Sequence, residues 1–228
     1  MRRILLSLIF CTHAATVLAQ GPYKVSVLKQ APPEAAAAGI RGLLNEEGFR
    51  IQDDKGQPLA DIWLRKTIPG SEKPAGPKEA VLFPFLADGE LIGVLQFVSE
   101  GHDYRDQSIA KGLYTMRYGL QPVNGDHLGV STYRDYSLLL PAAKDQKVDL
   151  PSRKQLEQRS AESAGTSHPA ILLMQGGSNG TTKAFPSMVR DNEKNTWGVA
   201  IPLKILVKGE AEPIVQPVVL VVVGTAPV

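Results

Sequence analysis

The stretch from His102 to Asp135 is dense in side chains that are able to do acid–base or metal chemistry. It contains His102, Asp103, Asp106, Asp126, His127 and Asp135. Histidine with carboxylate is a workable ligand set for zinc, iron or manganese, and the same groups suit general acid–base catalysis. If residues 112–120 form a strand whose flanking loops fold back, these side chains meet at one end of the domain. The expected metal ligands are then His102, Asp103, Asp126 and His127.

A structural role is the alternative for the same residues. Aspartate in turn sequences commonly accepts backbone hydrogen bonds, and an arginine–aspartate pair often pins a loop to a sheet. The tripeptide Tyr-Arg-Asp occurs at residues 104–106 and again at 133–135, so Arg105 and Arg134 are candidates for such loop-pinning contacts. The histidine spacing also matches no established zinc motif, because the sequence has neither His-x-His nor a histidine pair at helical spacing.

Aromatic side chains offer a second kind of site, one that binds without catalysing. Trp63, Tyr114, Tyr118 and Tyr133 lie on or beside expected strands, and rings on one sheet face can stack on sugars or pack against a peptide. The same ring types are also common in cores and in cross-strand pairs. The sequence therefore predicts a ligand-binding aromatic face and leaves core packing open as the alternative.

The first 19 residues have the organisation of a cleaved export signal. Arg2 and Arg3 are followed by an apolar run at residues 4–10 and by small or β-branched residues ending at Ala19. Thr12, His13 and Thr16 interrupt the run, and a spanning helix needs about 20 mostly apolar residues. We expect cleavage after Ala19, a mature domain at residues 20–228 without a membrane span, and a secreted or periplasmic location.

Removal of this leader changes which function classes remain. It takes away Cys11, the only cysteine, and with it disulfides, thiolate zinc sites and cysteine nucleophiles. The full chain has 25 Lys and Arg against 23 Asp and Glu, and loss of Arg2 and Arg3 leaves 23 against 23. A near-neutral chain without a basic stripe is not expected to bind nucleic acid.

Alternation of apolar and polar residues, as at 23–28 and 112–120, and a nearly continuous apolar run at 91–98 predict a mainly β fold with one or two peripheral helices. The uncharged run at 214–223 needs cover on both faces, so we expect it to be a central strand. The expected strands are residues 23–28, 49–52, 59–68, 91–98, 112–120, 136–140, 170–175, 187–190, 196–207 and 214–223, with an edge piece at 81–85. A surface helix is expected at 150–164, with Pro151 near its start and Gly165 just past its end. Closely spaced strands without regular helices between them favour antiparallel pairing, so we expect an antiparallel β-sandwich or jelly-roll-like domain.

Several segments resemble exported bacterial β-domain proteins of unknown function. The resemblance is carried by residues 111–122, by Gly-Asp-His at 125–127, by residues 133–141, and by Asp-Ile-Trp-Leu-Arg at 61–65. It covers about half of the chain and implies export and β-structure. It implies no catalytic residue and no cofactor.

These observations favour an exported, non-enzymatic protein that binds a ligand or partner in the periplasm or cell envelope. A carbohydrate, a peptide or an envelope protein is the expected kind of partner. The alternative is a metal-assisted hydrolase that uses the His/Asp residues between 102 and 135. A third hypothesis is a purely structural module of an envelope assembly.

Overall fold

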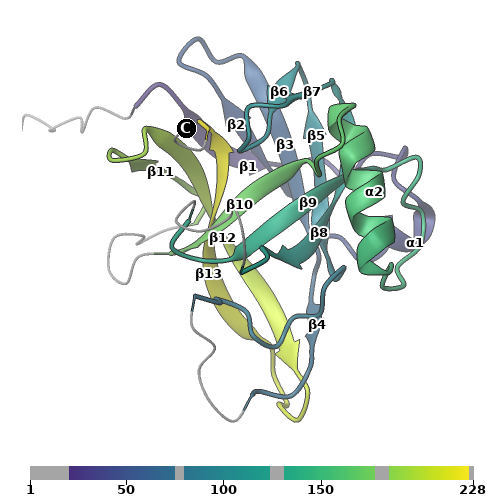
Figure 1. Cartoon of the computed structure of the whole chain (residues 1–228). Coiled ribbons are helices and arrows are strands. Elements are labelled where there is room, and N and C mark those ends of the chain that lie inside the picture. Colours follow the sequence, from purple (N-terminus) through teal and green to yellow (C-terminus); the bar gives the residue numbers. More distant parts are fainter. Residues whose placement is uncertain (1–20, 75–79, 124–130, 178–184, 226–228) are drawn as a thin grey trace, which may run out of the picture.

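The computed structural model of the 228-residue chain describes residues 21–74, 80–123, 131–177 and 185–225. The expected export signal lies outside the described residues. Ten strands form one continuous hydrogen-bonded path (Figure 1). In spatial order they are β1 (Lys24–Leu28), β2 (Gly48–Gln52), β3 (Pro58–Leu64), β5 (Leu91–Phe97), β8 (Gly112–Leu120), β9 (Asp135–Pro141), β10 (Ile171–Gly176), β13 (Ile214–Val223), β12 (Thr196–Val207) and β11 (Ser187–Asp191).

Every neighbouring pair along this path is antiparallel. One further strand, β4 (Ile68–Gly70), pairs in parallel with β12 and makes the sheet mixed. A small separate hairpin joins β6 (Gly101–His102) to β7 (Ser108–Ile109). The described helices are α1 (Ala38–Arg41) and α2 (Arg153–Ala164), and neither is long and apolar enough to cross a membrane.

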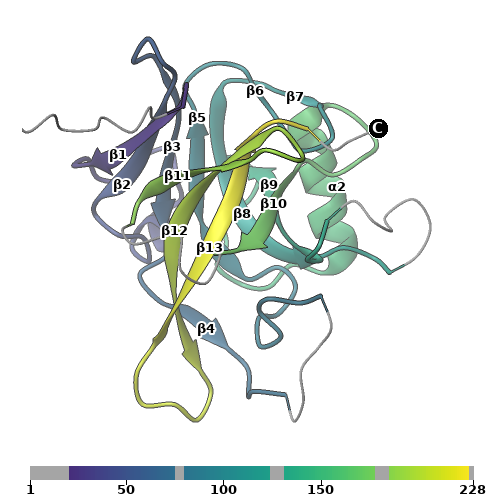
Figure 2. The same ribbon diagram turned by 90° about the vertical axis from the view of Figure 1, so that its left-hand side faces the viewer.

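The prediction of a mainly β fold with one or two peripheral helices is confirmed, whereas the expected sandwich or jelly roll is not. Instead of two stacked sheets, one sheet curls into a half-barrel whose concave side holds the largest apolar cluster (Figures 1 and 2). The alternation of apolar and polar residues along a strand specifies which side chains face inward. The same alternation occurs in a sheet that stacks on a second sheet and in one that coils on itself, so it does not distinguish the two architectures. The expected edge piece at 81–85 is not a strand, and the hairpin strand expected to reach residue 68 ends at Leu64.

Strand β8 shows how the sequence sorts side chains between the two faces. Tyr114, Met116 and Tyr118 belong to the apolar cluster inside the half-barrel. Thr115 and Arg117 alternate with them, so they point to the convex outer face, yet both are completely buried. The outer face must therefore be covered by other parts of the chain.

Helix α2 provides part of this cover, because it packs along the outer face of β9 (Figure 1). Ser152 caps its N-terminus in a capping box with Gln155, and Gly165 ends it in the left-handed conformation at φ 64°. Leu156 is buried in a second apolar cluster with Leu138 and Leu173. The helix starts at Arg153, three residues later than expected, and ends at the expected residue.

The two ends of the strand order, β1 and β11, lie side by side at a seam that side chains close (Figure 2). The rings of Tyr23 and Trp197 meet edge to face with centroids 5.6 Å apart, and the Arg190 guanidinium lies 5.5 Å from the Trp197 ring centroid. Gly21 lies so close that a Cβ there would be 1.8 Å from the indole ring. Trp197 therefore acts as a latch that holds the N-terminal strand against the far edge of the sheet.

Replacing this latch is expected to loosen β1 while the rest of the sheet stays folded. Trp197→Ala removes a half-buried ring and should cost about 2 kcal/mol of unfolding free energy, below the range for fully buried aromatic residues. Hydrogen–deuterium exchange of residues 21–28 should accelerate more than exchange of β8 or β9. Trp197→Phe, which keeps a ring against Gly21, serves as the control. Unchanged exchange in residues 21–28 of Trp197→Ala would contradict the latch.

Candidate functional site

The histidine and aspartate residues expected to bind metal are only partly within the described chain. His102 is half exposed, with its Nδ1 atom 3.3 Å from Asp106 Oδ1 in the β6–β7 hairpin. Asp126 and His127 lie outside the described residues. Among those that are described, no group of three His, Cys, Asp or Glu side chains could hold a metal ion. Metal binding by His102, Asp103, Asp126 and His127 therefore stays a prediction.

Asp103 has a structural role in the same hairpin. Its side chain is buried, and Oδ1 accepts the backbone N–H groups of Arg105 and Gln107 at 2.8 and 2.9 Å. Its Oδ2 atom accepts the N–H group of Ile171 at 3.1 Å and the Gln107 side-chain amide at 2.8 Å. These bonds close the turn and tie it to β10.

Asp135 ties a second loop to the sheet. Its buried carboxylate accepts the backbone N–H groups of Leu82 and Phe83 and the Tyr118 hydroxyl, the last at 2.7 Å. Burial raises the pKa of the Asp135 carboxyl, and these hydrogen bonds oppose the rise. Burial, together with the nearby Asp135 charge, raises the pKa of the Tyr118 phenol. The neighbouring Arg134 donates from Nε to the backbone carbonyl of Gln121 at 2.8 Å, so it pins its loop through a carbonyl rather than through an acid.

The four aromatic residues singled out from the sequence do not share an exposed face. Trp63 is buried on the convex side, where its indole N–H donates to the Gln30 carbonyl at 2.8 Å. Tyr114 and Tyr118 are buried inside the half-barrel. Tyr133 is half-buried, and its ring lies against Gly176. The first three rings thus occupy core positions, the alternative that the sequence left open.

A buried ion pair lies beneath the chain segment that follows β9. It shapes a candidate binding site more directly than any of the residues singled out from the sequence. Arg117 and Asp145 form a two-pronged contact, with Nε to Oδ2 at 2.8 Å and Nη2 to Oδ1 at 3.0 Å. The Arg117 side chain is fully buried and that of Asp145 is 1% exposed. Thr115 Oγ1 donates to the same carboxylate at 2.6 Å.

The remaining Arg117 donors hold the chain that follows. Nη1 lies 2.9 Å from the Gly89 carbonyl and within 3.4 Å of the carbonyls of Val148 and Asp149, and Nη2 donates to the Lys147 carbonyl. Every N–H group of this guanidinium therefore points at an acceptor. The ion pair fixes residues 145–149 to the outer face of the sheet.

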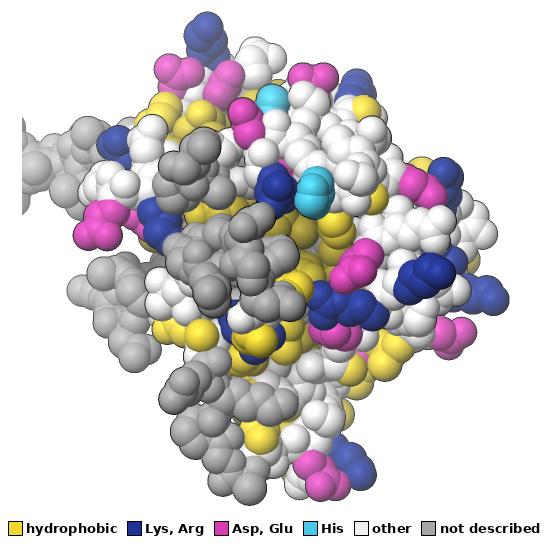
Figure 3. Space-filling view, in the orientation of Figure 1, with side chains coloured by type: hydrophobic (Ala, Val, Ile, Leu, Met, Phe, Trp, Pro, Cys, Tyr) yellow, Lys and Arg dark blue, Asp and Glu magenta, His cyan; other side chains and the backbone are white. Residues whose placement is uncertain are grey.

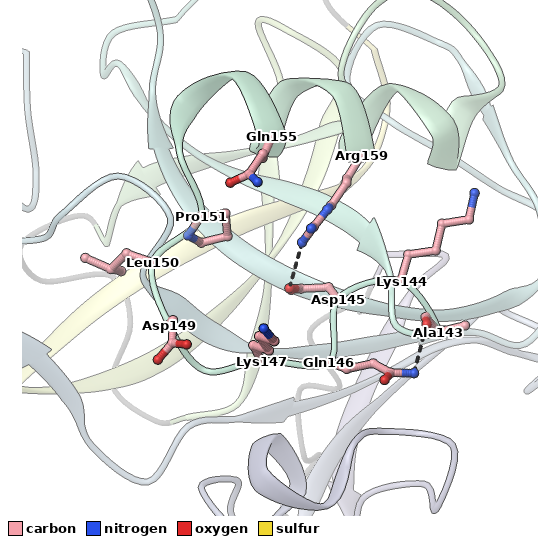
Figure 4. Close-up of a pocket in the computed structure, with 10 residues that line it drawn as sticks. All are labelled: Ala143, Lys144, Asp145, Gln146, Lys147, Asp149, Leu150, Pro151, Gln155 and Arg159. Atoms are coloured by element: carbon pink, nitrogen blue, oxygen red, sulfur yellow. Dashed lines mark hydrogen bonds and ion pairs between the residues drawn. The ribbon is translucent and has the colours of Figure 1, made fainter.

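Above this ion pair lies an open depression, which we call the α2 hollow. It has a volume of about 430 Å³. It is lined by Ala143, Lys144, Asp145, Gln146, Lys147, Asp149, Leu150, Pro151, Gln155 and Arg159. Figure 4 shows Gln155 and Arg159 reaching from α2 toward the segment that carries Asp145 and Lys147.

The ionisable groups of the α2 hollow differ in how fully they are engaged. Asp145 already accepts hydrogen bonds from Arg117 and Thr115, and Lys144 pairs with Glu162 at 2.7 Å. Arg159 approaches Asp145 Oδ1 only to 3.8 Å, which is longer than a hydrogen bond, and its side chain is 35% exposed. The hollow therefore presents hydrogen-bond donors with spare capacity above a carboxylate whose charge is already paired with Arg117.

The wider surface around α2 has no dominant sign of charge. Figure 3 shows lysine and arginine side chains interspersed with aspartate and glutamate on the side where α2 lies. Salt bridges such as Arg153 with Asp88 at 3.0 Å and with Glu157 at 2.8 Å account for part of this mixture. The spare donors of the α2 hollow are thus a local feature rather than part of a large basic patch.

The sequence reasoning missed this site, although one signal was present. The alternation in residues 112–120 places Arg117 on a different face from the tyrosines, in the middle of a strand with little other charge. A guanidinium there needs a buried carboxylate. Three aspartates lie in residues 131–150, at positions 135, 145 and 149, and Asp145 is the one that the fold brings to Arg117.

Breaking the Arg117–Asp145 pair is expected to be strongly destabilising. Asp145→Asn and Arg117→Met each leave one buried charge without its partner, which should cost about 3–5 kcal/mol in urea unfolding. The double variant should lose less than the sum of the two single variants, because neither uncompensated charge remains. Lys208→Gln, which breaks an exposed pair with Glu72, should change stability by less than about 0.5 kcal/mol. A loss below about 1 kcal/mol in both single variants would contradict this role.

Asp135 should make stability fall with rising pH. Its folded pKa is raised above the usual value of about 3.8, so the unfolded chain loses this proton at lower pH than the folded protein does. Between those two pKa values the folded state binds more protons, and the free energy of unfolding should decrease by up to about 1.4 kcal/mol per pH unit. Asp135→Asn should remove this component from urea unfolding measured between pH 3.5 and 7. Parallel pH curves for the two proteins would show that Asp135 does not contribute.

No family model, curated protein or solved structure matches this chain. What the α2 hollow can bind must therefore follow from the chemistry of its own side chains.

Proposed function

We propose that this protein is an exported binding domain that holds a small polar ligand in the α2 hollow. The observation that carries the proposal is the contrast within the hollow between Asp145, which is paired with the buried Arg117 and Thr115, and Arg159, which has spare donors. The export part of the proposal rests on the leader-like residues 1–19. The location that follows is the periplasm, the cell envelope or the exterior.

The state of Asp145 favours binding over acid–base catalysis in this hollow. A general base must be within hydrogen-bond reach of a substrate proton, and the Asp145 side chain is only 1% exposed. The Asp145 oxygens instead accept one hydroxyl and two guanidinium N–H donors from groups that are themselves buried. Its role is to shape the floor of the hollow.

Size and composition also suit a small ligand. A volume of about 430 Å³ lies within the range of about 300–1,000 Å³ that is typical of ligand pockets. Leu150 and Pro151 supply apolar surface beside the polar groups. A carbohydrate or a short peptide, the ligand classes expected from the sequence, would offer both kinds of surface.

The test is ligand-detected NMR with the purified protein and a library of sugars, amino acids, short peptides and metabolites. Ala143→Trp places a large side chain in the hollow without altering Arg117 or Asp145, and it should abolish the binding seen with the unaltered protein. Ala211→Trp is the matched control, because Ala211 is exposed in the turn between β12 and β13. Binding that survives in Ala143→Trp, or a library without a ligand tighter than about 1 mM, would overturn the proposal.

A further inference from the structure

We infer that the α2 hollow selects ligands that carry an oxyanion, a carboxylate or a phosphoryl group, with Arg159 as the principal anchor. This inference rests on the proposed binding function and specifies the ligand class. It depends on which donors in the hollow are free, on the charge that remains there, and on the fact that the one carboxylate near Arg159 among the described residues is already paired with Arg117.

Arg159 is a guanidinium that the fold leaves only loosely engaged. Its only ion-pair partner in the described part of the chain is Asp145, at 3.8 Å. That carboxylate is already neutralised by Arg117, whose two contacts are 2.8 and 3.0 Å long. The planar guanidinium of Arg159 thus keeps a charge and a set of N–H groups that match the two oxygens of a carboxylate or phosphoryl group.

Two further donors lie around the same space (Figure 4). Lys147 is exposed, and no ion pair engages its ammonium group within the described residues. Gln155 uses its Oε1 atom to accept from Ser152 in the capping box, which leaves its side-chain NH₂ group available. The first turn of α2 adds the positive end of a helix dipole. All of these groups donate, so they complement acceptor oxygens.

The charged groups of the hollow that lack a close partner are mostly positive, which also suits a ligand with acceptor oxygens. Of the cations that line the hollow, Lys144 is paired with Glu162. Arg159 has only the 3.8 Å contact with Asp145, and Lys147 has no ion pair within the described residues. Of the anions, Asp145 is paired with Arg117, while Asp149 remains and points away from Arg159 in Figure 4. Two cations therefore face one anion, which favours an anionic ligand over a cationic one.

The geometry of the hollow argues against a bare ion as its full occupant. Its volume of about 430 Å³ greatly exceeds that of one phosphate or carboxylate group. An oxyanion held by Arg159 leaves room for a polar or apolar body that reaches Leu150 and Pro151. The inferred ligand is a small molecule with an oxyanion at one end.

The experiment is isothermal titration of the whole protein with inorganic phosphate and, separately, with malonate, at an ionic strength held constant with sodium chloride. Binding of either probe supports the inference, and the stronger one identifies the phosphoryl or the carboxylate form. Arg159→Gln should weaken binding at least about tenfold, because a charge-assisted pair is lost. Lys147→Gln should weaken it by a smaller factor. Arg105→Gln and Lys208→Gln, exposed cations in the β6–β7 hairpin and after β12, should leave binding unchanged.

The outcomes separate this inference from the proposed function. If neutral ligands bind in an Ala143-dependent way while phosphate and malonate do not, the hollow is a binding site but not an oxyanion site. Equal binding of phosphate by Arg159→Gln and the unaltered protein would also overturn the inference. If nothing binds in the hollow at all, both proposals fail. Circular dichroism and the thermal midpoint of each variant show whether the change in binding reflects the side chain or the fold.

Discussion

The buried pair between Arg117 and Asp145 is the interaction on which the outer face of this protein depends. Taking both charges out of water is costly, and the cost is offset only where geometry is good and every donor is used. That condition holds here, because the Arg117 guanidinium binds one carboxylate and a set of backbone carbonyls. A single side chain of β8 thereby fixes residues 145–149, a segment without regular secondary structure.

This constraint also determines what the α2 hollow offers to a ligand. Asp145 is held from below by Arg117 and Thr115, and Arg159 stays 3.8 Å from its Oδ1 atom. The same carboxylate therefore draws Arg159 toward the hollow by its charge without occupying its donors. A rigid floor and a partly engaged arginine above it follow from one interaction, and preorganisation of this kind lowers the entropic cost of binding.

Much of the fold was predictable because it depends on local pattern. Alternation located β8, and apolar runs located β5 and β13, the second of which holds the expected central position between β10 and β12. Gly165 marked the end of α2. The curl of the sheet was not predictable in this way, because it depends on which strands become neighbours and on contacts such as Tyr23 with Trp197, which are 174 positions apart in numbering.

The candidate site was harder to predict because side-chain type says little about whether a group is already satisfied. Asp103 and Asp135 looked like ligands by type, yet in the fold each accepts several backbone or hydroxyl hydrogen bonds. Arg159, which the sequence did not single out, is a group left with spare donors. Saturation depends on neighbours distant in sequence, here Arg117 and Thr115 acting on Asp145. A site built from unsatisfied groups therefore becomes visible only once the fold has assigned a partner to every other group.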